Sequence, residues 1–228
     1  MIKVKSPFKS PYKNLSLEEI LLKDQSIKDD IFMLYQNENT IVFGRNQNVL
    51  AEVDIDYVKK ENINLIRRVS GGGTVYHDKG NVNFSFITDN KKNSYKDFLE
   101  PIIKFLNSIG VNAEFKGKND VVVDGYKISG NAQYKHKGRM FHHGTLLFDV
   151  DLTKLGKALK PHPLKLQSKG IKSARARVKN IKEFIKEDMS AEKFMNLLFD
   201  FIDGEELDVT NYKVNEVKAL ENVRKSHD

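Results

Sequence analysis

The chain has 228 residues, of which 39% are hydrophobic and 10% aromatic, and its 38 Lys and Arg against 31 Asp and Glu give a net charge of +7. This length predicts one large domain or a domain with an appendage, and the composition excludes disordered and collagen-like classes. Zero cysteines exclude disulfides, thiolate metal sites and cysteine nucleophiles. No apolar run reaches the roughly 18 residues of a membrane span, and the Lys-rich start lacks the apolar segment of a secretory signal. We therefore expect a soluble, cytoplasmic protein that has no membrane partner.

The expected helices and strands alternate irregularly along the chain. A capping box of Ser16 and Glu19 predicts a helix at 17–23. The further expected elements are strands at 31–36 and 40–43, a helix at 54–61, strands at 63–69 and 82–86, a helix at 95–109, strands at 121–123, 126–133 and 140–148, and helices at 153–159 and 191–202. The strand at 82–86 alternates apolar with polar residues, which predicts a half-buried strand. Asp124-Gly125 predicts a two-residue hairpin turn. This irregular order favours an α+β fold with a mixed or antiparallel sheet.

Basic residues are concentrated in one segment and two Arg pairs. Residues 154–182 hold ten Lys and Arg and no acid, and Pro161-His162-Pro163 within them predicts a long loop. Such a segment fits a local anionic target, although a solvated surface of a Lys-rich protein would look the same. Only seven basic residues are Arg, and four of them form the pairs Arg67-Arg68 and Arg175–Arg177. Because the planar guanidinium can hold carboxylate or phosphate through two bonds, both pairs are candidate anion sites.

A Gly-rich segment follows the first Arg pair. Residues 67–78 read RRVSGGGTVYHD, and three successive glycines let the backbone approach a ligand and aim N–H groups at an anion. The spacing fits neither a Walker loop nor the Gly-x-Gly-x-x-Gly dinucleotide fingerprint. A glycine turn alone equally fits a purely structural role. The adjacent Arg pair favours anion binding.

Two strand segments carry further candidates. Asp120 precedes the predicted hairpin and Lys127 follows its turn, so the two side chains can approach one another. By residue type alone, Lys127 would be one more solvated lysine. His142 and His143 are adjacent on a strand and point to opposite faces, so they cannot share one metal, and no zinc-ligand spacing is present. We expect one of the two histidines to face a pocket.

Together these segments resemble the lipoate–protein ligases. The matching stretches are SPYKNLSLEE at 10–19, RRVSGGGTVYHDKGN at 67–81, KNDVVVDGYKISGNAQ at 118–133, FHHGTLLFDVDL at 141–152 and KGIKSARARVKN at 169–180. The resemblance covers about 10–185 and leaves a C-terminal helix and tail at 186–228. It implies a single catalytic domain over 1–228, similar in fold to biotin–protein ligases and class II aminoacyl-tRNA synthetases. Many ligases of this family carry a small C-terminal accessory domain, for which we expect no room in these 228 residues; the domain could be cut off, could be a separate polypeptide that acts in trans, or could be unnecessary here.

The resemblance implies a two-step reaction. Lipoate and ATP, with Mg²⁺, give lipoyl-adenylate and pyrophosphate; a lysine of an acceptor domain then takes the lipoyl group as an amide. The implied acceptors are the E2 component of 2-oxoacid dehydrogenases and the H protein of glycine cleavage.

The resemblance also implies which residues form the site. The catalytic residues would be Lys127 and Asp120. The residues that bind ATP and the adenylate would be Arg68, Gly73, Thr74, Val75, Tyr76, Asn81, Lys127, Ser173 and Arg175. The residues that bind lipoate would be Ser70, Gly71, Gly72, Lys127 and His143. No metal site is built from protein ligands alone: Mg²⁺ would arrive with ATP, with Asp120 as the candidate protein ligand.

Two other functions compete with this one. An octanoyl or lipoyl transferase on the same fold works without nucleotide activation; some such enzymes need a cysteine, which this chain lacks, and one type relies on an equivalent lysine. The Arg-bearing segment at 169–180 favours the ligase. A nucleic-acid-binding module would explain the basic segment but not the Gly turn, Lys127 or the His pair, so we expect no nucleic-acid partner.

Overall fold

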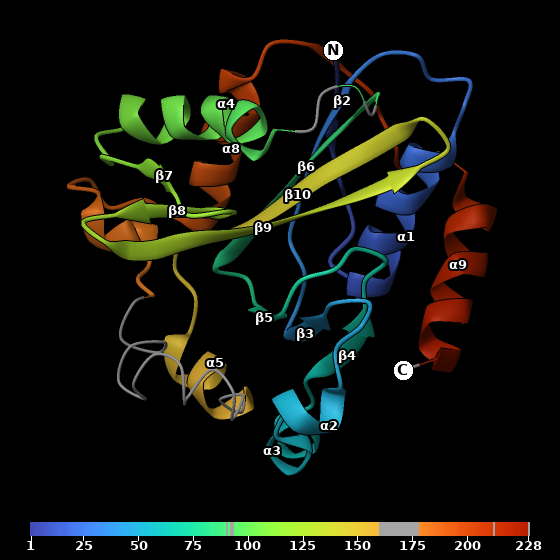
Figure 1. Cartoon of the computed structure of the whole chain (residues 1–228), viewed down its shortest axis with the longest axis horizontal. Helices are drawn as coiled ribbons and strands as arrows, with labels where there is room; N and C mark the ends of the chain where they lie inside the picture. The colour runs from blue at the N-terminus through green and yellow to red at the C-terminus, as the bar shows by residue number, and fades with distance from the viewer. Residues whose placement is uncertain (90, 92–93, 160–177, 212, 228) are drawn as a thin grey trace.

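The structure is a computed structural model of the chain, and it describes residues 1–89, 91, 94–159, 178–211 and 213–227. These residues form one large and one small β-sheet with helices packed around them (Figure 1). Among the helices described, none has both the length and the apolar character that a membrane crossing requires.

The large sheet contains eight strands within the described residues. Their spatial order is β11 (Glu205–Glu206), β1 (Ile2–Lys5), β2 (Ile31–Tyr35), β6 (Asn81–Asp89), β10 (Arg139–Leu147), β9 (Tyr126–His136), β8 (Asp120–Val123) and β7 (Glu114–Lys116). β1 is parallel to β2 and β11, whereas every neighbouring pair from β2 to β7 is antiparallel. This mixed sheet confirms the predicted α+β class.

The small sheet and the helices complete the fold. β3 (Thr40–Phe43) lies between a parallel β4 (Asn64–Arg67) and an antiparallel β5 (Thr74–His77). The helices in the described residues are α1 (Pro11–Lys23), α2 (Val49–Glu52), α3 (Ile55–Lys60), α4 (Tyr95–Ser108), α5 (Leu152–Ala158), the 3-10 helix η1 (Ile181–Phe184), α8 (Ala191–Phe201) and α9 (Val214–His227).

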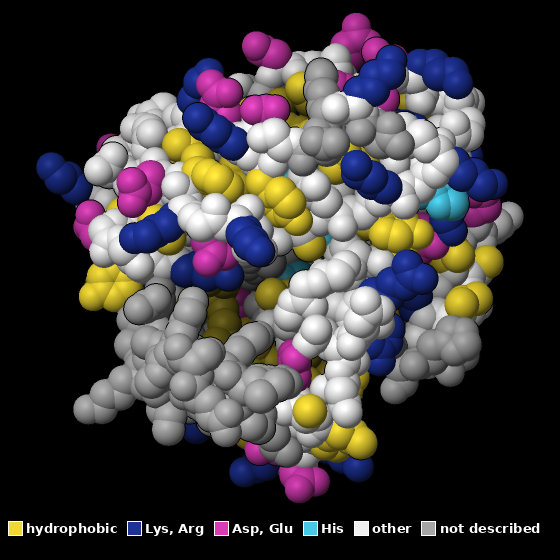
Figure 2. Space-filling view, in the orientation of Figure 1, with side chains coloured by type: hydrophobic (Ala, Val, Ile, Leu, Met, Phe, Trp, Pro, Cys, Tyr) yellow, Lys and Arg dark blue, Asp and Glu magenta, His cyan; other side chains and the backbone are white. Residues whose placement is uncertain are grey.

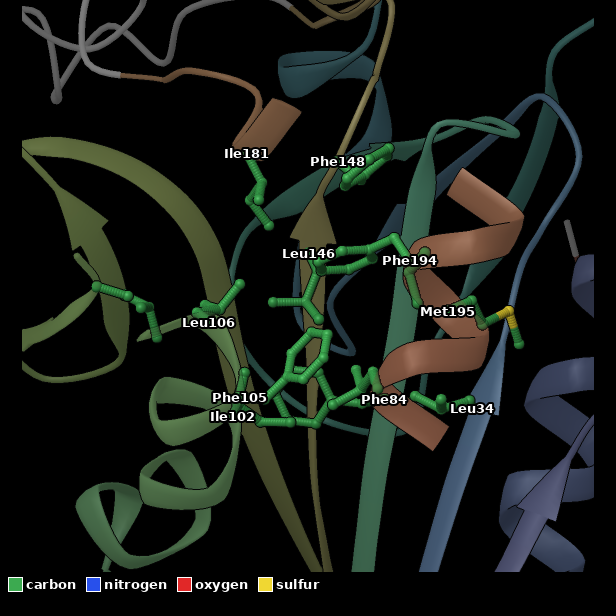
Figure 3. Packing of buried hydrophobic residues seen from close by; sticks show 14 of the residues in the cluster. Leu34, Phe84, Ile102, Phe105, Leu106, Leu146, Phe148, Ile181, Phe194 and Met195 are labelled. Atoms are coloured by element: carbon green, nitrogen blue, oxygen red, sulfur yellow. The ribbon is translucent and has the colours of Figure 1, made fainter. Parts of the chain in front are cut away.

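Helices cover both faces of the large sheet. On one face, α4 and α8 direct Phe105 and Phe194 toward Phe84 of β6 and Leu146 of β10 (Figure 3). On the other face, α1 packs against β10 and β6, and α9 lies beside α1 (Figure 1). The sheet that carries the candidates Asp120 on β8, Lys127 on β9 and His143 on β10 is therefore covered on both faces at its centre, β6 and β10.

This two-sided packing makes one sequence prediction wrong. The polar residues of β6, Asn83 and Ser85, are 1% and 0% exposed, so the strand is not half-buried. Ile87 shares their side of the strand and belongs to the core formed with α1. The alternation of β6 therefore separates two buried faces, because a helix replaces the solvent on the polar side.

The first helix also begins earlier than predicted. Pro11 occupies the first turn of α1, and the Ser10 hydroxyl caps it by accepting from the Lys13 backbone N–H. Pro fits this position because its fixed φ suits a helix start and its missing N–H costs nothing there. Ser16 is fully buried inside the helix, so the predicted Ser16–Glu19 capping box is wrong.

Two tight hairpins position β8, β9 and β10. Asp124 and Gly125 have φ of 50° and 80°, the left-handed values that the predicted turn requires. Lys137 and Gly138 repeat this geometry with φ of 43° and 83° and extend β9 beyond its predicted end. The sequence did not predict the second turn because Lys is not typical of its first position.

Candidate active site

Lys127 forms an ion pair with Asp120 across the β8–β9 hairpin. Lys127 Nζ lies 2.7 Å from Asp120 Oδ1, and the two side chains are 38% and 36% exposed. The approach that the hairpin predicted is therefore confirmed. A cation that is held by a carboxylate and still open to solvent can meet a second anion.

A β-bulge directs Lys127 over Gly130. The register passes from Val121 opposite Ser129 to Val122 opposite Lys127, so β9 contains one extra residue at this point. Residues three apart on a regular strand point to opposite faces, and a bulge removes that restriction. A Cβ placed on Gly130 would lie 3.1 Å from both Cε and Nζ of Lys127. Gly130 therefore leaves the space that the ammonium group occupies.

The Gly turn is open to solvent on one side. Gly71 and Gly72 are exposed, and Gly72 has a φ of 97°, which an L side chain rarely adopts. On its inner side the turn packs against residues 44 and 45: the Arg45 backbone N–H donates to Ser70 O at 2.9 Å. A ligand can thus approach the backbone of Gly71 and Gly72 from outside.

Arg68 holds the turn from within. Its guanidinium, 8% exposed, donates to Ser70 Oγ at 3.0 Å and to the carbonyls of Val42, Gly71 and Gly73 at 3.2, 2.8 and 2.8 Å. Burial lowers the pKa of Arg68 to about 10, and the nearby carboxylates of Glu18 and Glu52 oppose that shift. The predicted contact of Arg68 with phosphate stays a prediction, since these bonds use most of its donors.

The turn docks on β9 and β10 close to Lys127. A Cβ on Gly72 would lie 3.9 Å from the Ala132 Cβ. The neighbouring Ser70 Oγ lies 2.7 Å from Nε2 of His143, the residue paired with Ala132 in the sheet. Ala132 is two residues, or about 7 Å, along β9 from Gly130. The structure thus brings Lys127 close to the Arg pair and Gly turn at 67–73, which lie 54 to 60 residues earlier in the sequence.

The adjacent histidines do point to opposite faces, as predicted. His142 stacks on Phe98 at 5.0 Å in the α4 core, where burial, with a smaller contribution from His143, lowers its pKa to about 3. His143 lies on the α1 face, where Nδ1 is 3.0 Å from a carboxylate oxygen of Glu18. His143 therefore reaches the Gly turn, whereas His142 belongs to the core.

The side chains that follow the turn are occupied elsewhere. The Thr74 hydroxyl donates to Glu52 of α2, and the Tyr76 hydroxyl donates to Asn39 Oδ1 at 2.7 Å, with burial raising the pKa of Tyr76. Val75 packs against the core under α1, and Asn81 is fully buried. The predicted nucleotide contacts of these four residues stay predictions, and at Tyr76 and Asn81 the side chain is enclosed.

The second Arg-bearing segment is described only at its end. The predicted adenylate contacts Ser173 and Arg175 lie outside the described residues. Where the description resumes, Val178 forms a parallel bridge with Lys127, and the Lys179 N–H donates to Lys127 O at 3.2 Å. Lys179 Nζ also lies 4.4 Å above the Tyr126 ring. The downstream end of the basic segment therefore runs beside the catalytic candidate.

Two buried groups were not predicted from the sequence. Glu18 of α1 contacts His143, and His77 of β5 accepts from Asn37 Nδ2 at 3.0 Å through Nδ1. His77 Nε2 has no hydrogen-bond partner among the described residues, and burial, helped by Arg68 and His143, lowers the pKa of His77 to about 3. Both positions lie within stretches that match the family, at 10–19 and 67–81, but local patterns assign a role to neither, because their neighbours come from distant segments.

The surroundings of the site are cationic and offer few metal ligands. A groove of about 650 Å³ opens beside the turn, and four Arg, one Glu paired with one of them, and four apolar or aromatic residues line it: Arg45, Arg67, Arg68, Arg224, Glu19, Val69, Tyr134, Leu220 and Val223. In the described part of the chain, no three His, Asp or Glu side chains are grouped so that they could hold a metal. The face shown in Figure 2 is hollowed near its centre, with a histidine visible inside and basic side chains along its edge.

Comparisons with known proteins agree on one family. The family model described as the lipoyl protein ligase A/B catalytic domain matches residues 10–203. Lipoate–protein ligase 1 of Staphylococcus aureus is 47% identical over 218 residues, which cover 94% of this chain and 66% of that protein. The chain therefore spans just under two-thirds of the length of this curated relative.

Solved structures give the same result. A bi-partite lipoate protein ligase from Thermoplasma acidophilum, described with its E2 lipoyl domain, matches with a TM-score of 0.80 at 28% identity, over 97% of this chain and 91% of that one. A lipoate–protein ligase A bound with ATP matches with a TM-score of 0.81 at 25% identity, over 100% and 96% of the two chains. The resemblance inferred from the sequence is thereby confirmed.

Proposed function

We propose that this chain, which belongs to the family of lipoyl protein ligase A/B catalytic domains, activates lipoate with ATP and transfers the lipoyl group to a lysine of an acceptor domain. The observation that carries the proposal is the solvent-open ammonium of Lys127, held by Asp120 and Gly130 close to the exposed Gly turn. The S. aureus relative is named for this activity, and a solved neighbour is described as bound with ATP.

The first step joins two anions. A carboxylate oxygen of lipoate attacks the α-phosphorus of ATP, and the bond from this phosphorus to the oxygen that leaves with pyrophosphate breaks. Lys127 lies where its positive charge can offset both the carboxylate and the α-phosphate, and a fixed charge of this kind costs little reorganisation in the transition state. The exposed backbone of Gly71 and Gly72 can supply N–H donors to the same anions.

The second step transfers the acyl group. The amine of an acceptor lysine attacks the acyl carbon of lipoyl-adenylate, AMP leaves with the electron pair of the broken acyl–phosphate bond, and the amine loses a proton. Asp120 is the carboxylate beside Lys127 and is our candidate for orienting either that lysine or the incoming amine. The cationic groove beside the turn would attract an acidic acceptor domain.

Mg²⁺ is proposed as a companion of ATP. Proteins commonly bind Mg²⁺ through one or two carboxylates together with substrate phosphates, and Asp120 is the available carboxylate at Lys127. Mg²⁺ would neutralise phosphate charge, while Lys127 and the turn orient the reacting groups.

The acceptors, the accessory domain and the location are further proposals. We propose the E2 component and the glycine cleavage H protein as acceptors; the T. acidophilum neighbour is described with an E2 lipoyl domain. That neighbour is also described as bi-partite, which supports an accessory domain acting in trans. In that case the chain alone should use supplied lipoyl-adenylate faster than it forms the adenylate from ATP. We retain the single-domain organisation and the cytoplasmic location as proposals.

Mass spectrometry of an acceptor domain tests the proposed function. The domain is incubated with the chain, lipoate, ATP and Mg²⁺, and in parallel with octanoylated carrier protein without nucleotide. A lipoyl mass gain that needs ATP supports the ligase. An octanoyl mass gain of comparable extent, from the octanoylated carrier protein without ATP, would establish the transferase instead. Adding an accessory domain in trans, with ATP or with lipoyl-adenylate as the donor, measures which step depends on that domain.

A further inference from the structure

Glu18 is a buried carboxylate for which the proposed reaction has no role. Its side chain, on helix α1, is 3% exposed, and both carboxylate oxygens face His143 Nδ1, at 3.0 and 3.1 Å. Carboxylates are rarely buried unless they are paired or hydrogen-bonded, because removal from water is costly. The contact that holds this charge therefore indicates what the residue does.

The contact continues to the Gly turn. The other ring nitrogen of His143, Nε2, lies 2.7 Å from Ser70 Oγ, and Ser70 Oγ accepts from Arg68 Nε at 3.0 Å. Arg68 Nη2 then donates to the carbonyls of Gly71 and Gly73, each at 2.8 Å. A continuous hydrogen-bond chain thus runs from α1 through β10 to the turn.

When the His143 imidazole is neutral, the donors and acceptors of this hydrogen-bond chain allow a single arrangement of protons. An ionised carboxylate only accepts, so His143 Nδ1 carries the proton and donates to Glu18. Nε2 is then an acceptor, and the Ser70 hydroxyl donates to it while its lone pair faces Arg68 Nε–H. The opposite tautomer would place a nitrogen lone pair 3.0 Å from the carboxylate. Glu18 therefore selects the tautomer and, through it, the direction of the Ser70 proton.

The same series of hydrogen bonds determines which backbone group of the turn faces a ligand. In a trans peptide the N–H points opposite to the carbonyl. Because Arg68 binds the Gly71 carbonyl, the Gly72 N–H points away from the guanidinium, and Gly72 is an exposed residue. This N–H is thus available to an anionic oxygen of a ligand.

We propose that Glu18 is a positioning residue for substrate binding: through His143 and Ser70 it sets Arg68 and holds the Gly72 N–H toward the carboxylate or phosphate oxygen of the substrate. The inference rests on the proposed function for the identity of that anion. Glu18 itself touches no substrate, because Ser70, His143 and Arg68 lie between it and the open side of the turn.

Nitrogen-15 NMR of the histidine rings in the full chain tests the first link. In the wild type, we expect His143 to be the Nδ1–H tautomer. In Glu18→Leu the carboxylate is gone, and His143 should move to the Nε2–H tautomer that free imidazole side chains favour. The isosteric Glu18→Gln keeps one acceptor oxygen and should give a mixture of the two His143 tautomers. It replaces the leucine variant in this test if that variant does not fold. Glu100→Gln, an exposed carboxylate on α4, is the matched control and should leave the rings unchanged.

The second link is read from the turn and from the rate. The Gly72 amide resonance should shift in Glu18→Leu and less in Glu18→Gln. At equal folded fraction, the rate of lipoate adenylation should fall about 100-fold in Glu18→Leu, because a displacement near 1 Å costs about 10² in rate. The smaller displacement in Glu18→Gln should lower this rate about 10-fold. Binding of the acceptor domain should not change, which separates positioning from general loss of structure.

Three results would overturn the proposal: an unchanged His143 tautomer in Glu18→Gln and Glu18→Leu, an unchanged Gly72 amide despite a changed tautomer, or wild-type adenylation in variants with a displaced Gly72 amide. If the wild type makes no lipoyl-adenylate even when an accessory domain is supplied in trans, the proposed function fails separately. The tautomer and the amide shift still decide whether Glu18 positions the turn, and a titration with inorganic phosphate, followed at Gly72, then reports on anion binding.

Discussion

Gly130→Ala should impair catalysis without harming the fold. The added Cβ would lie 3.1 Å from both Cε and Nζ of Lys127, whereas favourable contacts with carbon lie at about 3.5–4.0 Å. The ammonium must therefore move by about 0.4–0.9 Å, which lengthens its 2.7 Å contact with Asp120 or turns the side chain into solvent. A displacement of this size costs up to about 10² in rate when geometry is critical. We expect lipoate adenylation to fall by about 10–100-fold.

The stability of this variant should move in the opposite direction. Gly130 is not among the residues with positive φ, so Ala can adopt its backbone conformation. Replacing Gly by Ala within a strand contributes about 0.5–1 kcal/mol through reduced freedom of the unfolded chain. The melting temperature should therefore stay the same or rise slightly. Loss of activity and preserved stability together distinguish a displaced lysine from a damaged sheet.

The assay is lipoate-dependent exchange of labelled pyrophosphate into ATP, with thermal unfolding measured on the same samples. Gly156→Ala is the matched control: Gly156 lies on α5, its φ is not positive, and an added Cβ would meet nothing within 4 Å. It should keep wild-type exchange. Wild-type exchange in folded Gly130→Ala would refute the argument that the precise place of the Lys127 ammonium matters.

Three further predictions follow from the same geometry. Arg68→Lys should destabilise the chain by about 2–4 kcal/mol in urea unfolding, because one ammonium cannot replace bonds to four acceptors and buried carbonyls lose partners; wild-type stability would contradict this. The pKa values of His77 and His142, about 3, lie below the 6.5 of an unfolded chain, so the unfolded state binds more protons between these values. Stability should rise with pH through this window by up to about 1.4 kcal/mol per unit for each histidine, with a smaller slope in His142→Phe; equal unfolding free energies at pH 5 and 7 would refute it. Arg224→Ala removes the bonds from α9 to Glu19 and to the β4 backbone and should lower stability by about 1–3 kcal/mol, read as faster amide exchange in α9; unchanged exchange would show that the helix is held by other contacts.

Local patterns predicted the parts of the site that lie within one hairpin or one strand. Asp124-Gly125 demanded a tight turn, and that turn, together with the bulge in β9, brought Asp120 to Lys127. The strand period alone placed His142 and His143 on opposite faces. In these cases the distance between the groups is determined by a few neighbouring residues.

Contacts between distant segments were beyond prediction from the sequence. Glu18 on a predicted helix resembles any surface carboxylate, and only the packing of α1 on β10 brings it to His143, 125 residues away. Arg68 was expected to face phosphate because of its residue type, whereas burial directs its donors to the carbonyls of the turn. Residues 2–5 alternate Lys with apolar residues like a surface tail, yet they form β1 because β2 and β11 supply partners on both sides.

The most direct test of the account is single-turnover formation of lipoyl-adenylate by Lys127→Ala. Lys135→Ala is the control, since it removes an exposed lysine from the same strand, β9. Loss of one fixed charge that stabilises the transition state should slow adenylation by about 10²–10³ while the fold stays intact. The control should react at the wild-type rate. Near-normal adenylation by folded Lys127→Ala, or equal losses in both variants, would contradict the central role of Lys127.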